Sequence, residues 1–156
     1  MVLKNLISTN ILNMSNKINL QYLISYFGIL PYLLVCIDKY FFFKIEEKIL
    51  FDFILYYSLI ISVFIGSLHW NLLKRISNYK IINGFLPSFY ATIVIILNLY
   101  NFHIFLLLFS IIILLLLQLF FDFILIFKNS IDRTAFYFLR IPLTILISLF
   151  LIILQL

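Results

Sequence analysis

The stretch FHIFLLLFSIIILLLLQLFFDFILIF, residues 102–127, decides the fold class of this protein. It is longer than the roughly 20 apolar residues with which a helix crosses about 30 Å of hydrocarbon, and Asp122 is its one carboxylate. The whole chain has the same character, because 65% of its residues are hydrophobic and 11% are charged. A soluble domain is about half apolar and about a quarter charged. The sequence therefore predicts an integral membrane protein.

Four further segments are long and apolar enough to cross a membrane. They are residues 19–37, 50–73, 84–100 and 136–156. Together with residues 102–127 they predict an all-α, polytopic membrane protein, a bundle of five transmembrane helices. No linker interrupts the apolar segments, so we expect residues 19–156 to form a single domain. Residues 1–18 are predicted to be a polar N-terminal tail, because they lack the apolar region and cleavage site of a signal peptide.

The basic residues indicate the orientation of the bundle. The Lys and Arg residues of the short connecting segments divide eight against three between the two sides, and the inner side of a membrane carries the excess. The sequence therefore predicts an N-inside, C-outside protein, and the net charge of +5 reflects topology, so we expect no nucleic-acid partner. The larger set is Lys4, Lys17, Lys74, Arg75, Lys80, Lys128, Arg133 and Arg140, whereas Lys39, Lys44 and Lys48 are offset by Asp38, Glu46 and Glu47.

Small and polar residues recur every four positions within the spans. Residues four apart share a helix face, and in lipid such faces are where helices approach closely and hydrogen-bond. We therefore expect these stripes, with Pro87 beside them, to face one another. They are Ser58, Ser62 and Gly66 on the second helix, Gly84, Ser88 and Thr92 on the third, and Arg140, Thr144 and Ser148 on the fifth.

Ionisable residues inside the spans predict a polar cluster. A charged group within a membrane is costly unless it is paired or hydrated. The predicted topology places several polar residues at similar depth on the inner side. We expect Asp122 to pair with Arg140, either as a structural ion pair or as part of an ion path, and the other members of the cluster are His69, Gln118 and Ser88.

The positions of three further polar residues, in or near the spans, can also be predicted. Trp70 is predicted to lie at the membrane interface, and its neighbour His69 is either a hydrogen-bonded interfacial residue or a proton relay. The other histidine, His103, is expected near the opposite face, too far away to provide a second haem ligand. Asp52 is expected to cap the outer start of the second helix.

Five motifs occur in order along the chain, namely GILPY (28–32), FIGSLHW (64–70), LPS (86–88), QLFFD (118–122) and LRIPLT (139–144). Together they resemble the domain-of-unknown-function 3429 family of transmembrane protein 69-like proteins. The departures are Tyr32 for Phe, Ser67 and Asn71 for Gly, and Phe123 for a basic residue. The resemblance spans residues 25 to 150 and implies a small helical protein of a mitochondrial inner membrane or a bacterial cytoplasmic membrane, with no assigned reaction.

No catalytic motif stands out, so the leading functional hypothesis is non-enzymatic. We expect a structural, assembly or accessory component of an energy-converting membrane, in contact with the lipid bilayer and with other membrane protein subunits. Abundant Phe, Ile, Asn and Lys with few Gly and Pro indicate an AT-rich genome, which fits an organelle. We expect no cofactor and no metal, and the single Cys36 excludes a disulfide within the chain.

The sequence leaves two alternative functions open. One is a small oligomeric transporter or a proton- or ion-conducting protein that uses His69, Gln118, Asp122 and Arg140. The other is a membrane enzyme that acts on a lipid or a quinone, with acid–base chemistry near His69 and Asp122. The effect of Asp122→Asn separates the first alternative from the leading hypothesis, because only a conducting protein has a flux to lose.

Overall fold

The computed structural model of the chain describes residues 20, 23–68, 78–127 and 136–156. All regular structure in these residues is helical, and five helical segments are long and apolar enough to cross a membrane. The predicted all-α architecture of five helices of transmembrane length is therefore confirmed. The five segments are Leu23–Phe42, Glu47–Ser67, Asn78–Leu99, Ile104–Leu125 and Phe136–Ile153.

The first and last of these spans are composite, and the middle three are single α-helices. A short helical stretch over residues 23–27 precedes α2 in the first span, and a one-turn π-helix follows it. In the last span a one-turn π-helix leads directly into α7. The elements are α2 (Leu30–Ile37), η1 (Asp38–Phe42), α3 (Glu47–Ser67), α4 (Asn78–Leu99), α5 (Ile104–Phe127), η2 (Phe136–Arg140) and α7 (Ile141–Ile153).

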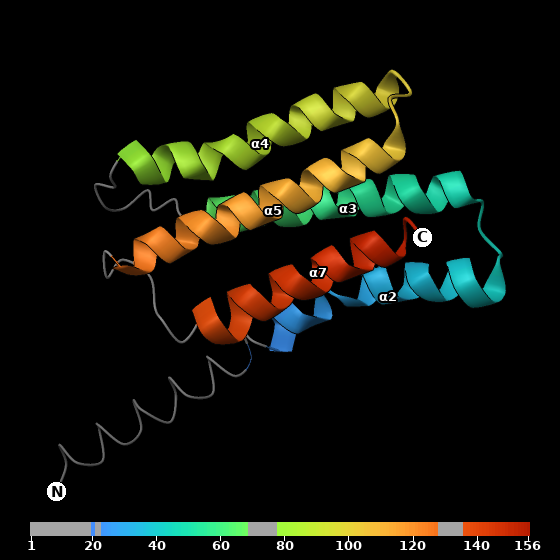
Figure 1. Ribbon diagram of the computed structural model, residues 1–156, viewed down its shortest axis with the longest axis horizontal. Coiled ribbons are helices and arrows are strands. Elements are labelled where there is room, and N and C mark those ends of the chain that lie inside the picture. Colours follow the sequence, from blue (N-terminus) through green and yellow to red (C-terminus); the bar gives the residue numbers. More distant parts are fainter. Residues whose placement is uncertain (1–19, 21–22, 69–77, 128–135) are drawn as a thin grey trace, which may run out of the picture.

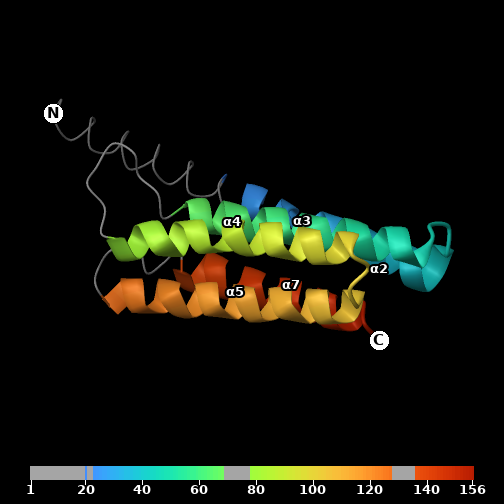
Figure 2. The same ribbon diagram turned by 90° about the horizontal axis from the view of Figure 1, so that it is seen from above.

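Consecutive spans run in opposite directions and pack as two layers. Figure 1 shows the helices side by side along the long axis, and Figure 2 shows α2, α3 and α4 in one layer with α5 and α7 in the other. The Arg140 end of the bundle, as we name it, is where α3 and α5 end and where α4 and α7 begin. The opposite end, the Lys39 end, holds η1, the α4–α5 turn and Leu156.

One helix begins well before its predicted start. α4 starts at Asn78 rather than at residue 84, so Pro87 and Ser88 lie in its third turn instead of just inside its beginning. The polar residues around Lys80 obscure this start in the sequence. Long amphipathic side chains can lie along an apolar helix surface and keep the polar tip in water, so they do not end a span.

Tyrosine hydroxyls bind two backbone carbonyls that lie near prolines. Pro142 has no backbone N–H, so the carbonyl of Phe138, four residues earlier, has no donor within the helix. The Tyr26 hydroxyl donates to this carbonyl at 2.7 Å and so ties the first span to the last. In the first span the carbonyl of Gly28, three residues before Pro31, accepts a hydrogen bond of 2.9 Å from the Tyr57 hydroxyl of α3.

α3 and α4 approach each other closely at Gly66. A Cβ atom placed on Gly66 would lie 2.8 Å from Cγ of Pro87 and 3.0 Å from the carbonyl oxygen of Gly84. Real Cβ atoms essentially never come this close to another heavy atom. The α3–α4 contact therefore depends on a glycine at position 66, as expected where small residues bring helices together in lipid.

The buried face of α4 differs from the predicted stripe. Gly84, Pro87, Ala91 and Val94 are buried, whereas Ser88 is half-buried and Thr92 is exposed. Steps of four residues rotate about 40° per step around an α-helix, because one turn takes 3.6 residues. Alternating steps of three and four residues stay on one side of the helix, and the observed face follows that spacing.

Candidate functional site

The central polar contact joins Asp122 of α5 to Arg140 at the end of η2. Arg140 Nε donates to Asp122 Oδ2 at 2.6 Å, and Arg140 Nη2 contacts the same oxygen. Asp122 is 2% exposed and the Arg140 side chain is 14% exposed, so the pair is almost fully enclosed. This is the pairing that the sequence predicts. Its geometry holds α5 against the last span at the Arg140 end.

Gln118 extends this polar contact to α3. It lies one turn before Asp122 on the buried face of α5, and its Nε2 donates to the carbonyl oxygen of Ser62 at 2.9 Å. Its Oε1 is enclosed and has no hydrogen-bond partner among the described residues. Polar groups thus follow one another from α3 through α5 to the last span.

The structure does not bring every predicted member into this cluster. Among the described residues, no hydrogen bond joins the half-buried Ser88 to Asp122, Arg140 or Gln118. His69 and Trp70 lie outside the described residues, so the predictions for them stay predictions. The polar cluster of the described chain consists of Gln118, Asp122 and Arg140, and we use the name in this sense below.

The predicted packing residues lie in the interior of the bundle to different extents. Ser58 and Ser62 are fully buried, and each hydroxyl donates to a carbonyl of its own helix, at 2.7 Å for Ser58 and 2.8 Å for Ser62. Thr144 is buried on α7. Ser148 is half-buried, and its enclosed Oγ has no partner among the described residues.

Sequence reasoning missed a buried tyrosine at the centre of the bundle. Tyr32 of α2 is fully buried, and its hydroxyl lies 2.8 Å from Oγ of Ser58. Its ring packs edge-on against Tyr57 and stacks on Phe150 of α7. The available signal was the tyrosine that stands where the resembled family has Phe, because a buried phenol requires a hydrogen-bond partner.

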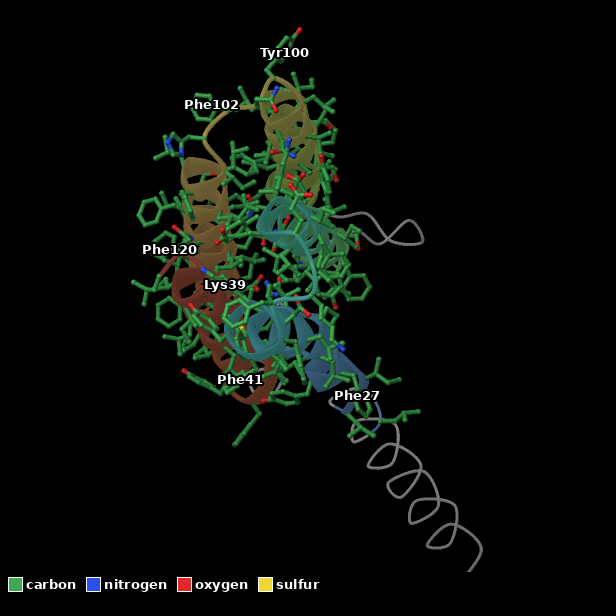
Figure 3. All side chains as sticks on the ribbon, turned by 90° about the vertical axis from the view of Figure 1, so that its right-hand side faces the viewer. Phe27, Lys39, Phe41, Tyr100, Phe102 and Phe120 are labelled. Atoms are coloured by element: carbon green, nitrogen blue, oxygen red, sulfur yellow. The ribbon has the colours of Figure 1, made fainter. Side chains whose placement is uncertain are left out.

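A second missed contact caps the C-terminus of α7. Lys39 Nζ donates to the carbonyl oxygen of Leu154 at 2.6 Å, and the Tyr40 hydroxyl donates to that of Ile153 at 2.5 Å. The last carbonyls of a helix have no partner within it and carry partial negative charge, so a cation there is stabilising. Figure 3 looks onto this end and labels Lys39. Lys39 therefore fastens η1 to α7.

A third missed feature is a polar cavity at the Lys39 end. Its volume is about 670 Å³, and its lining includes Asp52, Tyr56, Asn98 and His103. Asn98 Nδ2 donates to Asp52 Oδ1 at 3.1 Å and to the Tyr56 hydroxyl oxygen at 2.9 Å. The prediction that Asp52 caps the start of its helix is wrong. α3 begins at Glu47, and Asp52 lies in the second turn, where it links α3 to α4.

The chemistry of this arrangement comes from hydrogen bonds and from the Asp122–Arg140 ion pair. Comparisons with known protein families, with curated proteins and with solved structures found no match for the chain. In the described part of the chain, no group of three or more His, Cys, Asp or Glu side chains is placed to hold a metal ion. The observed chemistry is that of charge-assisted hydrogen bonds, which hold helices together in lipid.

Proposed function

We propose that this chain is a non-enzymatic accessory or assembly subunit of a complex in an energy-converting membrane. The membrane is a mitochondrial inner membrane or a bacterial cytoplasmic membrane, and the orientation is N-inside and C-outside. The resemblance of five motifs to the transmembrane protein 69-like family supports this location. The division of the basic residues among the connecting segments, eight against three in the sequence, supports the orientation.

One observation carries the proposal, namely three consecutive phenylalanines presented at the Lys39 end. Phe41, Phe42 and Phe43 are 78%, 60% and 76% exposed, and Phe41 is labelled at this end in Figure 3. Phe43 has φ 50°, in the left-handed region that bulky residues rarely adopt. Such strain costs about 1–3 kcal/mol and is concentrated at functional positions. We name these residues the Phe tip and assign it to a partner subunit, because aromatic residues, Phe among them, are enriched at protein interfaces relative to the rest of the surface.

The arrangement of polar groups supports the same proposal. Asp122 binds Arg140, Gln118 binds a carbonyl of α3, and Tyr32 meets Ser58, so these groups join helices of this chain to one another. Large apolar side chains point outward from α4 and α5. Among them are Phe85, Phe89, Phe109 and Phe120, each more than half exposed. The bundle thus presents apolar surfaces to lipid and to other subunits.

Native-gel migration of mildly solubilised membranes, with mass spectrometry of the co-migrating proteins, tests the proposal. We expect the wild-type chain to migrate in a large assembly with defined partners. The double variant Phe41→Ala/Phe42→Ala is expected to leave this assembly, whereas the control Phe109→Ala, an equally apolar change on the outer face of α5, is expected to stay in it. A wild-type chain that migrates alone or as a small homo-oligomer would overturn the proposal.

A second candidate function is conduction of protons or ions, and the polar cluster favours it. Gln118 Oε1 is enclosed without a partner among the described residues, one turn from the Asp122–Arg140 pair. Intramembrane carboxylates often line ion paths. For a conducting protein reconstituted in vesicles, Asp122→Asn abolishes flux while the chain stays folded. For an accessory subunit the wild-type vesicles carry no flux above that of empty vesicles.

A further inference from the structure

A groove of about 480 Å³ opens between the first span, the second half of α3 and the start of the last span. Its volume falls within the roughly 300–1,000 Å³ range of small-molecule sites, and like them it has mostly apolar walls and few polar groups. The polar side chains in its lining are those of Ser25 from the first span and of Arg140 and Thr144 from the last span. The apolar walls include Ile24, Gly28, Ile61, Ile65, Leu143 and Ile147.

Arg140 places a charged group at one end of this groove, and some of its N–H donors are not used by Asp122. A guanidinium has five N–H donors in a fixed fork, and the contact with Asp122 uses Nε and Nη2 toward a single oxygen. Among the described residues, no other acceptor takes a hydrogen bond from Arg140. Donors of this kind, arranged as a planar fork, suit phosphate oxygens particularly well.

The surroundings of the groove point to a lipid as its occupant. Its walls belong to helices of transmembrane length, and Phe64 and Leu68 at its border are exposed, so the groove opens toward the hydrocarbon. The side of the membrane at which α7 begins carries eight of the eleven basic residues by sequence. Basic pockets between transmembrane helices on the cytoplasmic or matrix side are typical sites for anionic headgroups.

We propose that this groove is a binding site for one anionic phospholipid. An acyl chain lies between the first span, α3 and α7, and a phosphate oxygen of the headgroup accepts a hydrogen bond from the remaining donors of Arg140. Arg140 then has two roles, since it neutralises Asp122 inside the bundle and binds the lipid at its edge. The proposal is independent of the identity of any partner subunit.

Native mass spectrometry and thermal unfolding of the purified full-length chain test this site. The probes are phosphatidylglycerol and phosphatidylcholine with identical acyl chains, and inorganic phosphate. We expect one phosphatidylglycerol per chain to be retained, with at least tenfold weaker retention of phosphatidylcholine and a rise in the unfolding temperature of several degrees with phosphatidylglycerol alone. Equal retention of the two lipids, or the same stabilisation by inorganic phosphate, would overturn the proposal.

Variants locate the lipid within the structure. Ile61→Trp fills the groove, and we expect it to weaken phosphatidylglycerol retention at least tenfold. Ile96→Trp places the same side chain on the exposed face of α4, outside the groove, and is expected to leave retention unchanged. Retention by Ile61→Trp at the wild-type level would contradict the assignment.

A measurement on the wild-type chain keeps the test decisive if Ile61→Trp does not fold. A phosphatidylglycerol with a photoreactive group on its acyl chain is cross-linked to the protein, and the modified residues are mapped by mass spectrometry. We expect cross-links in residues 24–28, 61–65 and 143–147, the segments that contain most of the lining residues of the groove. Cross-links confined to other surfaces would overturn the proposal.

Discussion

The α3–α4 contact and the α5–α7 contact hold helices together by opposite means. α3 and α4 meet by shape, because the missing side chain at Gly66 lets Pro87 approach the backbone. α5 and the last span are joined by charge, through Asp122 and Arg140. Lipid provides no hydrophobic drive for helix association, so either close packing or polar bonds must supply it. This chain has three glycines, so few of its positions allow close packing of helix backbones. Between α5 and the last span, a buried ion pair provides the contact instead.

The largest effect is expected from breaking the ion pair on one side. Arg140→Leu leaves the Asp122 carboxylate buried without its cation, and we expect the free energy of unfolding to fall by about 3–5 kcal/mol. The double variant Asp122→Leu/Arg140→Leu removes both charges and is expected to recover most of this loss. Unfolding in mixed micelles measures both variants. A single variant as stable as the double one would show that the pair is not a unit.

A smaller loss in the free energy of unfolding is expected when the α3–α4 contact at Gly66 is disturbed. Gly66→Val places atoms within contact distance of Pro87 and of the Gly84 carbonyl, and we expect a loss of about 1–3 kcal/mol by overpacking. Ser67→Val is the matched control, because Ser67 is the next residue on α3 and is exposed. Its effect in the same unfolding experiment is expected to stay below about 0.5 kcal/mol. Equal effects of Gly66→Val and Ser67→Val would show that the α3–α4 contact does not depend on the missing side chain at Gly66.

These two contacts differ in how far the sequence predicts them. Asp122 and Arg140 are recognisable because a charge inside a span must find a partner, and few candidates exist. Gly66 is recognisable by its four-residue spacing from Ser62 and Ser58. The partner of Lys39 is not recognisable, because a backbone carbonyl at the end of α7 leaves no mark in the side-chain pattern. The prediction that Thr92 faces the neighbouring helices is wrong, because residues four positions apart rotate progressively around an α-helix.

The α2–α3 contact offers an intermediate case. Tyr32→Phe removes the hydroxyl that meets Ser58, but Ser58 still donates to the carbonyl of Ile54, so we expect a loss of about 0.5–1.5 kcal/mol. Ser58→Ala instead leaves the Tyr32 hydroxyl buried without this partner, and its expected loss is about 1–3 kcal/mol. The order of the two losses is measured in the same micelles, and the reverse order would contradict the geometry described for this pair.

A gain in stability, rather than a loss, is expected at the Phe tip, outside the helix contacts. Phe43→Gly relieves the left-handed backbone at φ 50°, and we expect a gain in stability of about 1–2 kcal/mol. Asn101→Gly is the control, because Asn101 has a similar φ of 56° but belongs to a residue type that tolerates it, so little change is expected. A loss of stability in Phe43→Gly would show that the ring contributes to the bundle itself, rather than to a partner.

The most direct test of the structural role of the ion pair combines stability with assembly. Membranes that contain the wild type or the double variant Asp122→Leu/Arg140→Leu are solubilised mildly, and the migration of each chain on native gels is compared. If the pair serves to hold α5 to the last span, both chains are expected to fold and to migrate in the same large assembly. A double variant that folds with wild-type stability but leaves the assembly would contradict that role and would assign the two charges a function beyond the fold.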